Sequence, residues 1–413
     1  MITVARRRLT HLVRWLILGT IVGAMAGVLS AAFVGALNWA GDTRTAHAWL
    51  VWMLPLGGLV VGCSYHYLGR GLERGSNLII EGIHSGGAPI PLRLTPLIFG
   101  ASVVTHVVGG SAGREGAALQ LAAGVTDPLT ARLGLGEADR SLMLIAAIAG
   151  GFGSVFGVPI AGAVFALEVQ RVGRVRYDAL VPAFTASLVG DAIVRALGVE
   201  HTAYPALSGI HWSPAVAWKV ALFGLLAGLV ALMFVSATHA VRDVARRLIA
   251  WYPARPMVGG ALLAVLIVAC GWRDYQGLSI PLALEAMNGS AAGQWVTKLG
   301  LTALTIGTGF VGGEVIPLFV IGALAGASFA SLIGGNVALF ATIGSVAVLA
   351  GAANTPLACT ILGIELFGGS GLVMFGVACA AAYATSGHAG IYHSQLVGAH
   401  KSGDDTGHRS ATP

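Results

Sequence analysis

The stretch GGSAGREGAALQ, at residues 109–120, places an arginine and a glutamate side by side between glycines. The twenty residues that precede Arg114, 94–113, contain no Asp, Glu, Lys or Arg. A charged side chain is costly inside a bilayer, and ionisable residues in membrane segments usually serve a function. We therefore take Glu115, at the start of the apolar run that follows, as the first candidate functional residue of the chain.

The composition predicts a protein that crosses a membrane many times. Of the 413 residues, 56% are hydrophobic and only 10% are charged, whereas soluble domains carry about 25% charged residues. About 20 apolar residues span a bilayer core, and the uncharged tract 315–364 is long enough for two crossings. The expected fold class is an all-α polytopic membrane protein.

Positive charge predicts the orientation of the chain. Four arginines precede the first apolar run: Arg6, Arg7, Arg8 and Arg14. An excess of basic residues favours a cytoplasmic position, so we expect the N-terminus in the cytoplasm. We also expect a cytoplasmic C-terminus and a location in the inner cell membrane. The first apolar run continues to about Leu37, beyond the 7–15 apolar residues of a secretory signal. The net charge of +6 is attributed to cytoplasmic loops, because no basic run with interleaved aromatic residues indicates nucleic-acid binding.

Catalytic and metal motifs point away from an enzyme. The four cysteines stand singly in apolar segments, and the twelve histidines include no HExxH pattern. We expect no metal, no organic cofactor and no enzymatic activity. The letters GGSAG formally match the G-x-S-x-G elbow of serine hydrolases, so a membrane-embedded hydrolase with Ser111 as nucleophile is the alternative from another class. That motif needs a strand, a turn and a helix, whereas its surroundings indicate helices.

Two pairs of segments indicate an internal duplication. PIAGAVFALE at 159–168 matches PLACTILGIE at 356–365, and GREGAAL at 113–119 matches GGEVIPL at 312–318 with Glu115 opposite Glu314. The two separations are nearly equal and the order is the same. We divide the chain into a cytoplasmic N-terminus 1–11, a first membrane repeat 12–200, a linker 201–212, a second membrane repeat 213–398 and a disordered cytoplasmic tail 399–413.

Short apolar segments broken by Gly or Pro occur in both halves, a pattern typical of transporters with a binding site near the bilayer midplane. Glu115 and Glu314 both stand at predicted helix starts, where free N–H groups and the helix dipole favour an anion. A carboxylate there can compete with a free anion, and protonation would release it. The alternative for Glu115 is a structural carboxylate paired with Arg114. Glu168 and Glu365, at the ends of apolar helices, are interpreted as structural.

The motifs GSNLI (75–79), GREGA (113–117), GGEVIP (312–317) and GIYHSQ (390–395), in this order, resemble the CLC family of chloride channels and anion/proton antiporters. The resemblance implies an inverted repeat of broken helices, and a homodimer in which each subunit holds its own anion pathway. It also implies that Glu115 is the gating and proton-transferring glutamate. The candidate anion-binding residues are Ser76, Asn77, Gly113, Arg114, Gly116, Glu314, Val315, Ile316 and Tyr392, with the backbone N–H groups of Glu314 and Val315 expected to coordinate the anion.

Within the family, GREG, the glutamate of GGEV and SGHAGIY near the C-terminus resemble the fluoride/proton antiporter branch. Ser76 and Ile316 depart from that branch, which often has Met or Asn, and Thr, at these places. We expect a halide/proton antiporter that exports fluoride in exchange for protons. A chloride/proton antiporter and a passive chloride channel of the same fold remain open. The expected partners are halide ions, protons, membrane lipid and a second copy of the chain.

Overall fold

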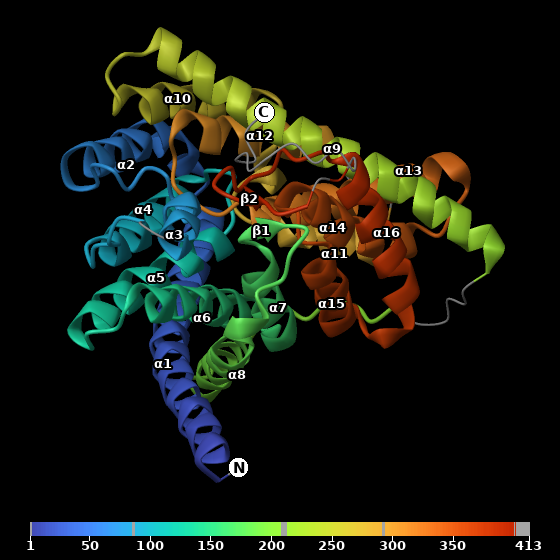
Figure 1. The fold of residues 1–413 in the computed structure, drawn as a ribbon. Coiled ribbons are helices and arrows are strands. Elements are labelled where there is room, and N and C mark those ends of the chain that lie inside the picture. The colour runs from blue at the N-terminus through green and yellow to red at the C-terminus, as the bar shows by residue number, and fades with distance from the viewer. Residues whose placement is uncertain (1, 85–86, 208–212, 291–293, 400, 402–413) are drawn as a thin grey trace.

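The fold is almost entirely helical, as Figure 1 shows. The computed structural model describes all residues except 1, 85–86, 208–212, 291–293, 400 and 402–413. Part of the predicted linker and most of the predicted tail therefore lie outside the described residues. Among the described helices, 6 are long and apolar enough to cross a membrane. The prediction of an all-α polytopic membrane protein is confirmed.

The helices form two successive runs. The first run contains α1 (Ile2–Ala46), α2 (Leu54–Leu68), α3 (Ser76–Ile83), α4 (Leu94–Val108), α5 (Glu115–Arg132), α6 (Glu137–Phe156), α7 (Pro159–Glu168) and α8 (Leu180–Ala196), with 3-10 turns η1 (Ala48–Met53) and η2 (Tyr177–Ala179). The second run contains α9 (Pro214–Leu248), α10 (Ala254–Ala269), α11 (Ile280–Met287), α12 (Trp295–Thr308), α13 (Val315–Ile333), α14 (Val337–Ala353), α15 (Pro356–Phe367) and α16 (Leu372–Thr385), with η3 (Arg273–Tyr275) and η4 (Gly369–Gly371). Two short strands, β1 (Arg171–Val172) and β2 (Leu396–Val397), pair in parallel.

The two runs repeat one packing plan. Helix α1 packs on α8 as α9 packs on α16, and α5 packs on α6 as α13 packs on α14. The halves contact each other through equivalent pairs, α2 with α10 and α7 with α15. This plan agrees with the duplication inferred from the sequence. Helix α1 begins at Ile2 and so runs through most of segment 1–11, which we expect to precede the first membrane repeat.

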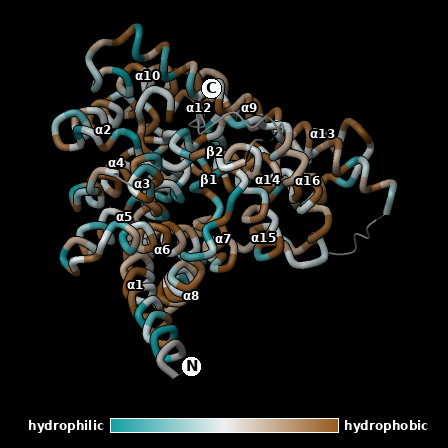
Figure 2. Tube along the Cα trace, viewed as in Figure 1, coloured by the Kyte–Doolittle hydropathy of each residue, from teal (hydrophilic) through white to brown (hydrophobic). Residues whose placement is uncertain are grey.

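Close helix packing explains why the chain contains so many glycines. Helix α1 has 45 residues, which at about 1.5 Å per residue is roughly 68 Å and more than twice a bilayer core. It presents Gly19, Gly23 and Gly27 to α8, and a Cβ added at Gly23 would lie 2.5 Å from Ala186 O. Figure 2 shows hydrophobic residues predominating along the helices. Small residues let such apolar helices approach closely in a membrane.

Carboxylates join the two halves reciprocally. Glu168, the last residue of α7, accepts two backbone N–H groups from the first turn of α15, including that of Ala358 at 2.8 Å. Glu365 of α15 accepts two from the first turn of α7, including that of Ala161 at 2.6 Å. Each carboxylate thus caps a helix of the other half and satisfies N–H groups that have no partner within their own helix. Both glutamates have the structural role expected from the sequence.

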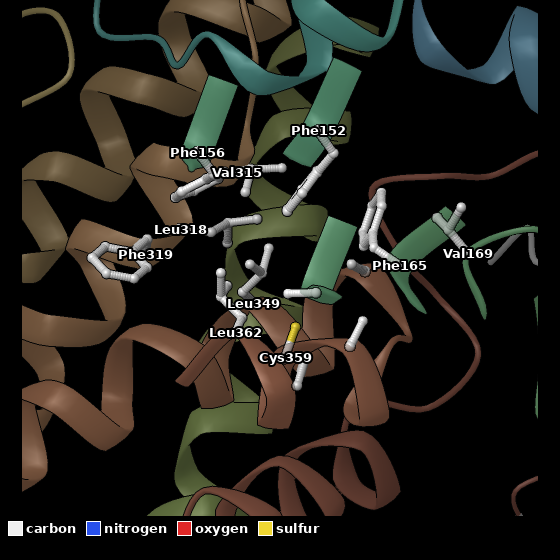
Figure 3. Close-up of a cluster of buried hydrophobic side chains, with 14 of the residues drawn as sticks. Phe152, Phe156, Phe165, Val169, Val315, Leu318, Phe319, Leu349, Cys359 and Leu362 are labelled. Atoms are coloured by element: carbon white, nitrogen blue, oxygen red, sulfur yellow. The ribbon is translucent and has the colours of Figure 1, made fainter. Parts of the chain in front are cut away.

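A dense apolar core lies where helices of both halves meet. Figure 3 shows Phe152, Phe156 and Phe165 from the first half facing Val315 and Leu318 from the second. The Phe152 and Phe165 rings are stacked with centroids 4.4 Å apart. Because Val315 is the first residue of α13, this core fixes the helix start beside which the candidate site is built.

Candidate functional site

The site is built where equivalent loops of the two halves meet. The 109–114 loop joins α4 to α5, and the 309–314 loop joins α12 to α13. Gly113 and Gly313 form an isolated antiparallel bridge, with N–H to O distances of 2.6 and 2.7 Å. Each preceding helix is capped by a glycine with positive φ, 95° at Gly109 and 110° at Gly309, a conformation that favours glycine. The N-termini of α5 and α13 therefore converge.

The Glu115 carboxylate lies between these two helix ends. Its Oε2 accepts the backbone N–H of Arg114 at 3.2 Å and that of Ile316 at 3.3 Å. The Glu115 side chain is completely buried. Free N–H groups at helix N-termini attract negative charge, so the carboxylate occupies the position that the two helices make favourable for an anion.

Arg114 contacts the same carboxylate through its side chain. It is 6% exposed, and its Nε lies 3.6 Å from Glu115 Oε1. That oxygen has no hydrogen-bond partner among the described residues. One carboxylate oxygen is thus held by backbone donors, and the other is held only by the attraction of a guanidinium at longer range. The pairing of Arg114 with Glu115 that we considered from the sequence is present.

The two helix starts are offset by one residue from the sequence match. Glu115 is the first residue of α5, whereas Glu314 immediately precedes α13. The positional counterpart of Glu314 is therefore Arg114, and the match of Glu115 with Glu314 was wrong by one position. The backbone donor to Glu115 from the second half is Ile316, one of the candidate anion-binding residues.

A cavity of about 780 Å³ leads to the site. Five of the candidate residues line it: Ser76, Asn77, Gly116, Glu314 and Tyr392. Four arginines from three parts of the chain also line it: Arg74, Arg242, Arg246 and Arg255. The sequence analysis did not identify these arginines, although Arg242 and Arg246 stand four residues apart near the end of α9 and so lie on one helix face. A cleft lined by positive charge raises the local anion concentration.

Ser76 and Tyr392 lie together beside Gly116. The Ser76 hydroxyl donates to Gly116 O at 3.3 Å. A void of about 10 Å³ is lined by Ser76, Tyr392 and six apolar side chains, which is room for about one water-sized particle. Gly116 also packs closely, since an added Cβ would lie 3.3 Å from Gly313 Cα. The structure therefore brings these three candidates to one place.

The segment that carries Tyr392 is tied to the rest of the protein by polar side chains. Asn77 Oδ1 accepts the Ser394 N–H at 3.1 Å, so the amide oxygen of this candidate is engaged with the protein itself. Gln395 donates to Val169 O at 2.7 Å and to Ala353 O at 2.9 Å. Because Val169 belongs to the first half and Ala353 to the second, Tyr392 is fixed at the junction of the halves.

Ser111 is not arranged as a hydrolase nucleophile. It lies in the loop between two helices rather than in a strand, turn and helix, and it is fully buried. Its Oγ contacts Thr302 Oγ1 and Lys298 Nζ, each at 2.9 Å. The G-x-S-x-G match is therefore accidental. Lys298 escaped the sequence analysis, where its only signal was a single charge within an apolar segment.

Comparison with known proteins identifies the family. The family model described as "Voltage gated chloride channel" matches residues 57–387. The chain belongs to this family. A "Chloride/fluoride channel protein" of Pseudomonas syringae pv. tomato is 42% identical over 400 residues, covering 94% of this chain and 88% of the relative. An "H(+)/Cl(-) exchange transporter ClcA" of Cronobacter sakazakii is 24% identical over 381 residues, covering 85% of this chain and 81% of the relative.

Solved structures of family members share the fold. The structure of "a CLC-type fluoride/proton antiporter" has a TM-score of 0.89 at 31% identity, covering 93% of this chain and 98% of that one. The structure of "a slow cyanobacterial Cl-/H+ antiporter" has a TM-score of 0.75 at 21% identity, covering 90% and 94%. The resemblance to the CLC family noted in the sequence is confirmed.

Proposed function

We propose that this chain is a CLC-type halide/proton antiporter that exports fluoride in exchange for protons, with Glu115 as its gate. The observation that carries the proposal is the position of the Glu115 carboxylate, which bonds to N–H groups of two helix starts and faces Arg114. The carboxylate is a tethered anion at a site suited to free ones. The name of the 42% identical relative, a chloride/fluoride channel protein, supports a halide substrate. The solved fluoride/proton antiporter supports exchange of fluoride with protons.

The exchange follows from competition for one set of donors. A protonated Glu115 is neutral, so its attraction to the helix ends and to Arg114 falls and the side chain leaves. A halide ion then binds the vacated N–H groups of Arg114 and Ile316, which restores the negative charge that the site needs. When Glu115 loses its proton, it returns and displaces the halide. Each departure of the gate therefore requires a proton, and each return releases one.

Other candidate residues would act on the cavity side of the gate. Ser76 and Tyr392, beside the small void, are assigned to contact a halide there, with Asn77 holding the Tyr392 segment in place. Gly113 and Gly116 keep the two loops close, and Val315 anchors α13 in the core. Glu314 would supply a second protonatable group where the cavity meets the site. Fluoride is strongly hydrated, so extra polar groups help to replace its lost water.

Charge also supports a cytoplasmic cavity. Basic residues cluster where α1 begins and where α9 ends, and the cavity is lined by Arg242 and Arg246 from that end of α9. The positive-inside tendency favours the cytoplasm for both regions. Fluoride would then enter from the cytoplasm. The proposal includes an inner-membrane location and a homodimer surrounded by lipid. The apolar residues Ile160 of α7 and Leu357 of α15 are 45% and 55% exposed in the single chain, and they would be covered by lipid or by the second subunit.

A chloride/proton antiporter is the second candidate. It is favoured by Ile316, whose backbone N–H donates to Glu115 and whose side chain is apolar. It is also favoured by the relative named as an H(+)/Cl(-) exchange transporter. A less polar site suits chloride, which gives up less hydration energy than fluoride.

The experiment is efflux from proteoliposomes, followed with fluoride, chloride and pH electrodes. We expect fluoride efflux to drive proton uptake and to exceed chloride efflux. Faster chloride efflux would replace the first candidate by the second. Halide efflux without proton movement would contradict antiport of either kind, and hydrolysis of esters that is lost in Ser111→Ala would restore the hydrolase alternative.

A further inference from the structure

Lys298 is a completely buried lysine that the proposed mechanism does not use. It belongs to the first turn of α12, and its amine lies among loops that precede α5 and α11. The amine contacts four oxygens: Gly277 O at 2.7 Å, Ser111 Oγ at 2.9 Å, Ser279 Oγ at 3.0 Å and Tyr275 O at 3.2 Å. No other lysine among the described residues is fully buried.

The hydrogen-bond geometry indicates that this amine carries a positive charge. The Ser279 hydroxyl donates its own proton to Gln276 O, so toward Lys298 it acts as an acceptor. The carbonyls of Tyr275 and Gly277 can only accept. Three acceptors require three N–H groups, which a neutral amine lacks and an ammonium provides. Lys298 is therefore held as an ammonium by neutral oxygens.

The charge has no counter-ion within the described part of the chain. Lys298 forms no ion pair there, and neither does Arg44. Arg44 lies against the same loop, since a Cβ added at Gly277 would be 2.2 Å from its Nη1. Burying a charge without an opposite charge is unfavourable. The ammonium assigned above and the Arg44 guanidinium lie beside the same loop without an ion pair, so their positive charges add there.

The ammonium is attached to the loop that ends at the gate. It bonds to Ser111, and the same loop continues through the Gly113 bridge to Glu115. Ser111 is held from a second side by the Thr305 hydroxyl, which accepts its N–H at 3.2 Å. Four residues of chain span at most about 14 Å, so the ammonium and the Glu115 carboxylate are attached to the two ends of one short segment.

We propose that Lys298 is a fixed cation that strengthens halide binding at the position occupied by the Glu115 carboxylate. It does not contact the halide; it acts through the loop that it holds and through its field. The inference rests on the proposed exchange of Glu115 with a halide. Unlike Glu115, the ammonium stays in place throughout the cycle, so it favours whichever anion occupies the site.

The test measures halide flux as a function of halide concentration in the Glu115→Gln background, where the gate no longer competes. A unit charge acting over about 15 Å, close to the upper limit set by this segment, changes anion affinity roughly sixfold at an effective dielectric constant of about 20. We expect Lys298→Met to raise the KM for fluoride by that factor with little change in the maximal rate. Ser279→Ala removes one acceptor but keeps the ammonium, and its KM should stay at the parent value.

A second pair of variants keeps the charge test independent of the buried lysine. Ser111→Asp places a carboxylate beside the ammonium and cancels its field, whereas Ser111→Asn has the same size without the charge. We expect a raised KM for Asp and a nearly unchanged KM for Asn. Equal KM values for Asp and Asn, or a parent-like KM in Lys298→Met, would overturn the role of Lys298. Absence of halide flux in the parent protein would instead overturn the proposed function.

Discussion

Helices α5 and α13 begin in the same way yet carry different chemistry. Both follow a helix that ends in a glycine with positive φ, and both start beside the Gly113–Gly313 bridge. The first start bears Arg114 and Glu115, and the second bears Glu314 and Val315. The two glutamates differ by one position relative to the helix start. The Glu115 carboxylate accepts the backbone N–H groups of Arg114 and Ile316, whereas Glu314 lines the cavity.

The difference shows how a duplicated frame can acquire two functions. The backbone of each half contributes donors to one anion position, so that position needs both copies. The side chains next to it need not be alike, and of the two carboxylates only that of Glu115 accepts backbone N–H groups from both halves. The second carboxylate, Glu314, lines the cavity instead. The predictions below separate these roles.

The largest effect is expected from Glu115→Gln, which removes the charge that competes with the anion. Proton movement should fall roughly 100-fold or more, the scale of losing a proton-transferring side chain, while halide flux persists. Parallel fluoride and pH electrode recordings measure both. Glu137→Gln, an exposed carboxylate in the first turn of α6, is the matched control and should remain coupled. Coupling that survives in Glu115→Gln would refute the gate.

Asp127→Ala should destabilise the protein by about 3–5 kcal/mol, the usual cost of breaking a buried ion pair. Asp127 anchors α5 by accepting from Arg140 at 2.5 Å and from the Ile90 N–H at 2.6 Å. Thermal unfolding in detergent measures the loss. The control is Asp139→Ala, whose partly exposed pair with Arg14 should be worth about 1 kcal/mol or less. Similar melting temperatures for the two variants would contradict this anchor.

Glu314→Gln should slow proton-coupled halide flux roughly tenfold, equivalent to about 1.4 kcal/mol in a barrier. The glutamine keeps the size of the side chain but cannot exchange a proton with the cavity. Glu73→Gln, at another carboxylate that lines the same cavity, serves as control. If both variants transport at the wild-type rate, Glu314 has no part in proton transfer.

The smallest effect is expected from Ile316→Thr. A hydroxyl beside the helix donors adds one hydrogen bond to the bound anion, worth about 1.5–3 kcal/mol. Fluoride is the stronger acceptor, so the ratio of fluoride to chloride flux should rise several-fold. Ile316→Val reduces the side chain without adding a hydroxyl, so its ratio should match the wild type. A ratio that moves equally in both variants would assign selectivity to side-chain size.

Much of the fold could be predicted because the two repeats keep similar residues at equivalent helix starts. The repeats could be recognised in this way. The broken helices were indicated by Gly and Pro within short apolar segments, and the structural role of Glu168 and Glu365 by their position at helix ends. The position of Glu314 relative to the start of α13 could not be predicted. Matching Glu115 to Glu314 aligned identical residue types, whereas the equivalent backbone positions are Arg114 and Glu314. Long-range contacts were also hidden. Nothing near Lys298 in the sequence indicates that Ser111 and Gly277 bind it, and nothing near Asn77 indicates Ser394.

The reciprocal caps on α7 and α15 bear on how the protein is made. While the ribosome is still producing the second half, the first-turn N–H groups of α7 already exist and their acceptor, Glu365, does not. Lipid offers no substitute for that acceptor. The first half therefore lacks this acceptor until a residue some 200 positions downstream has been made, so the junction of α7 with α15 cannot be completed before that point. A chain released early would expose this unfinished helix end.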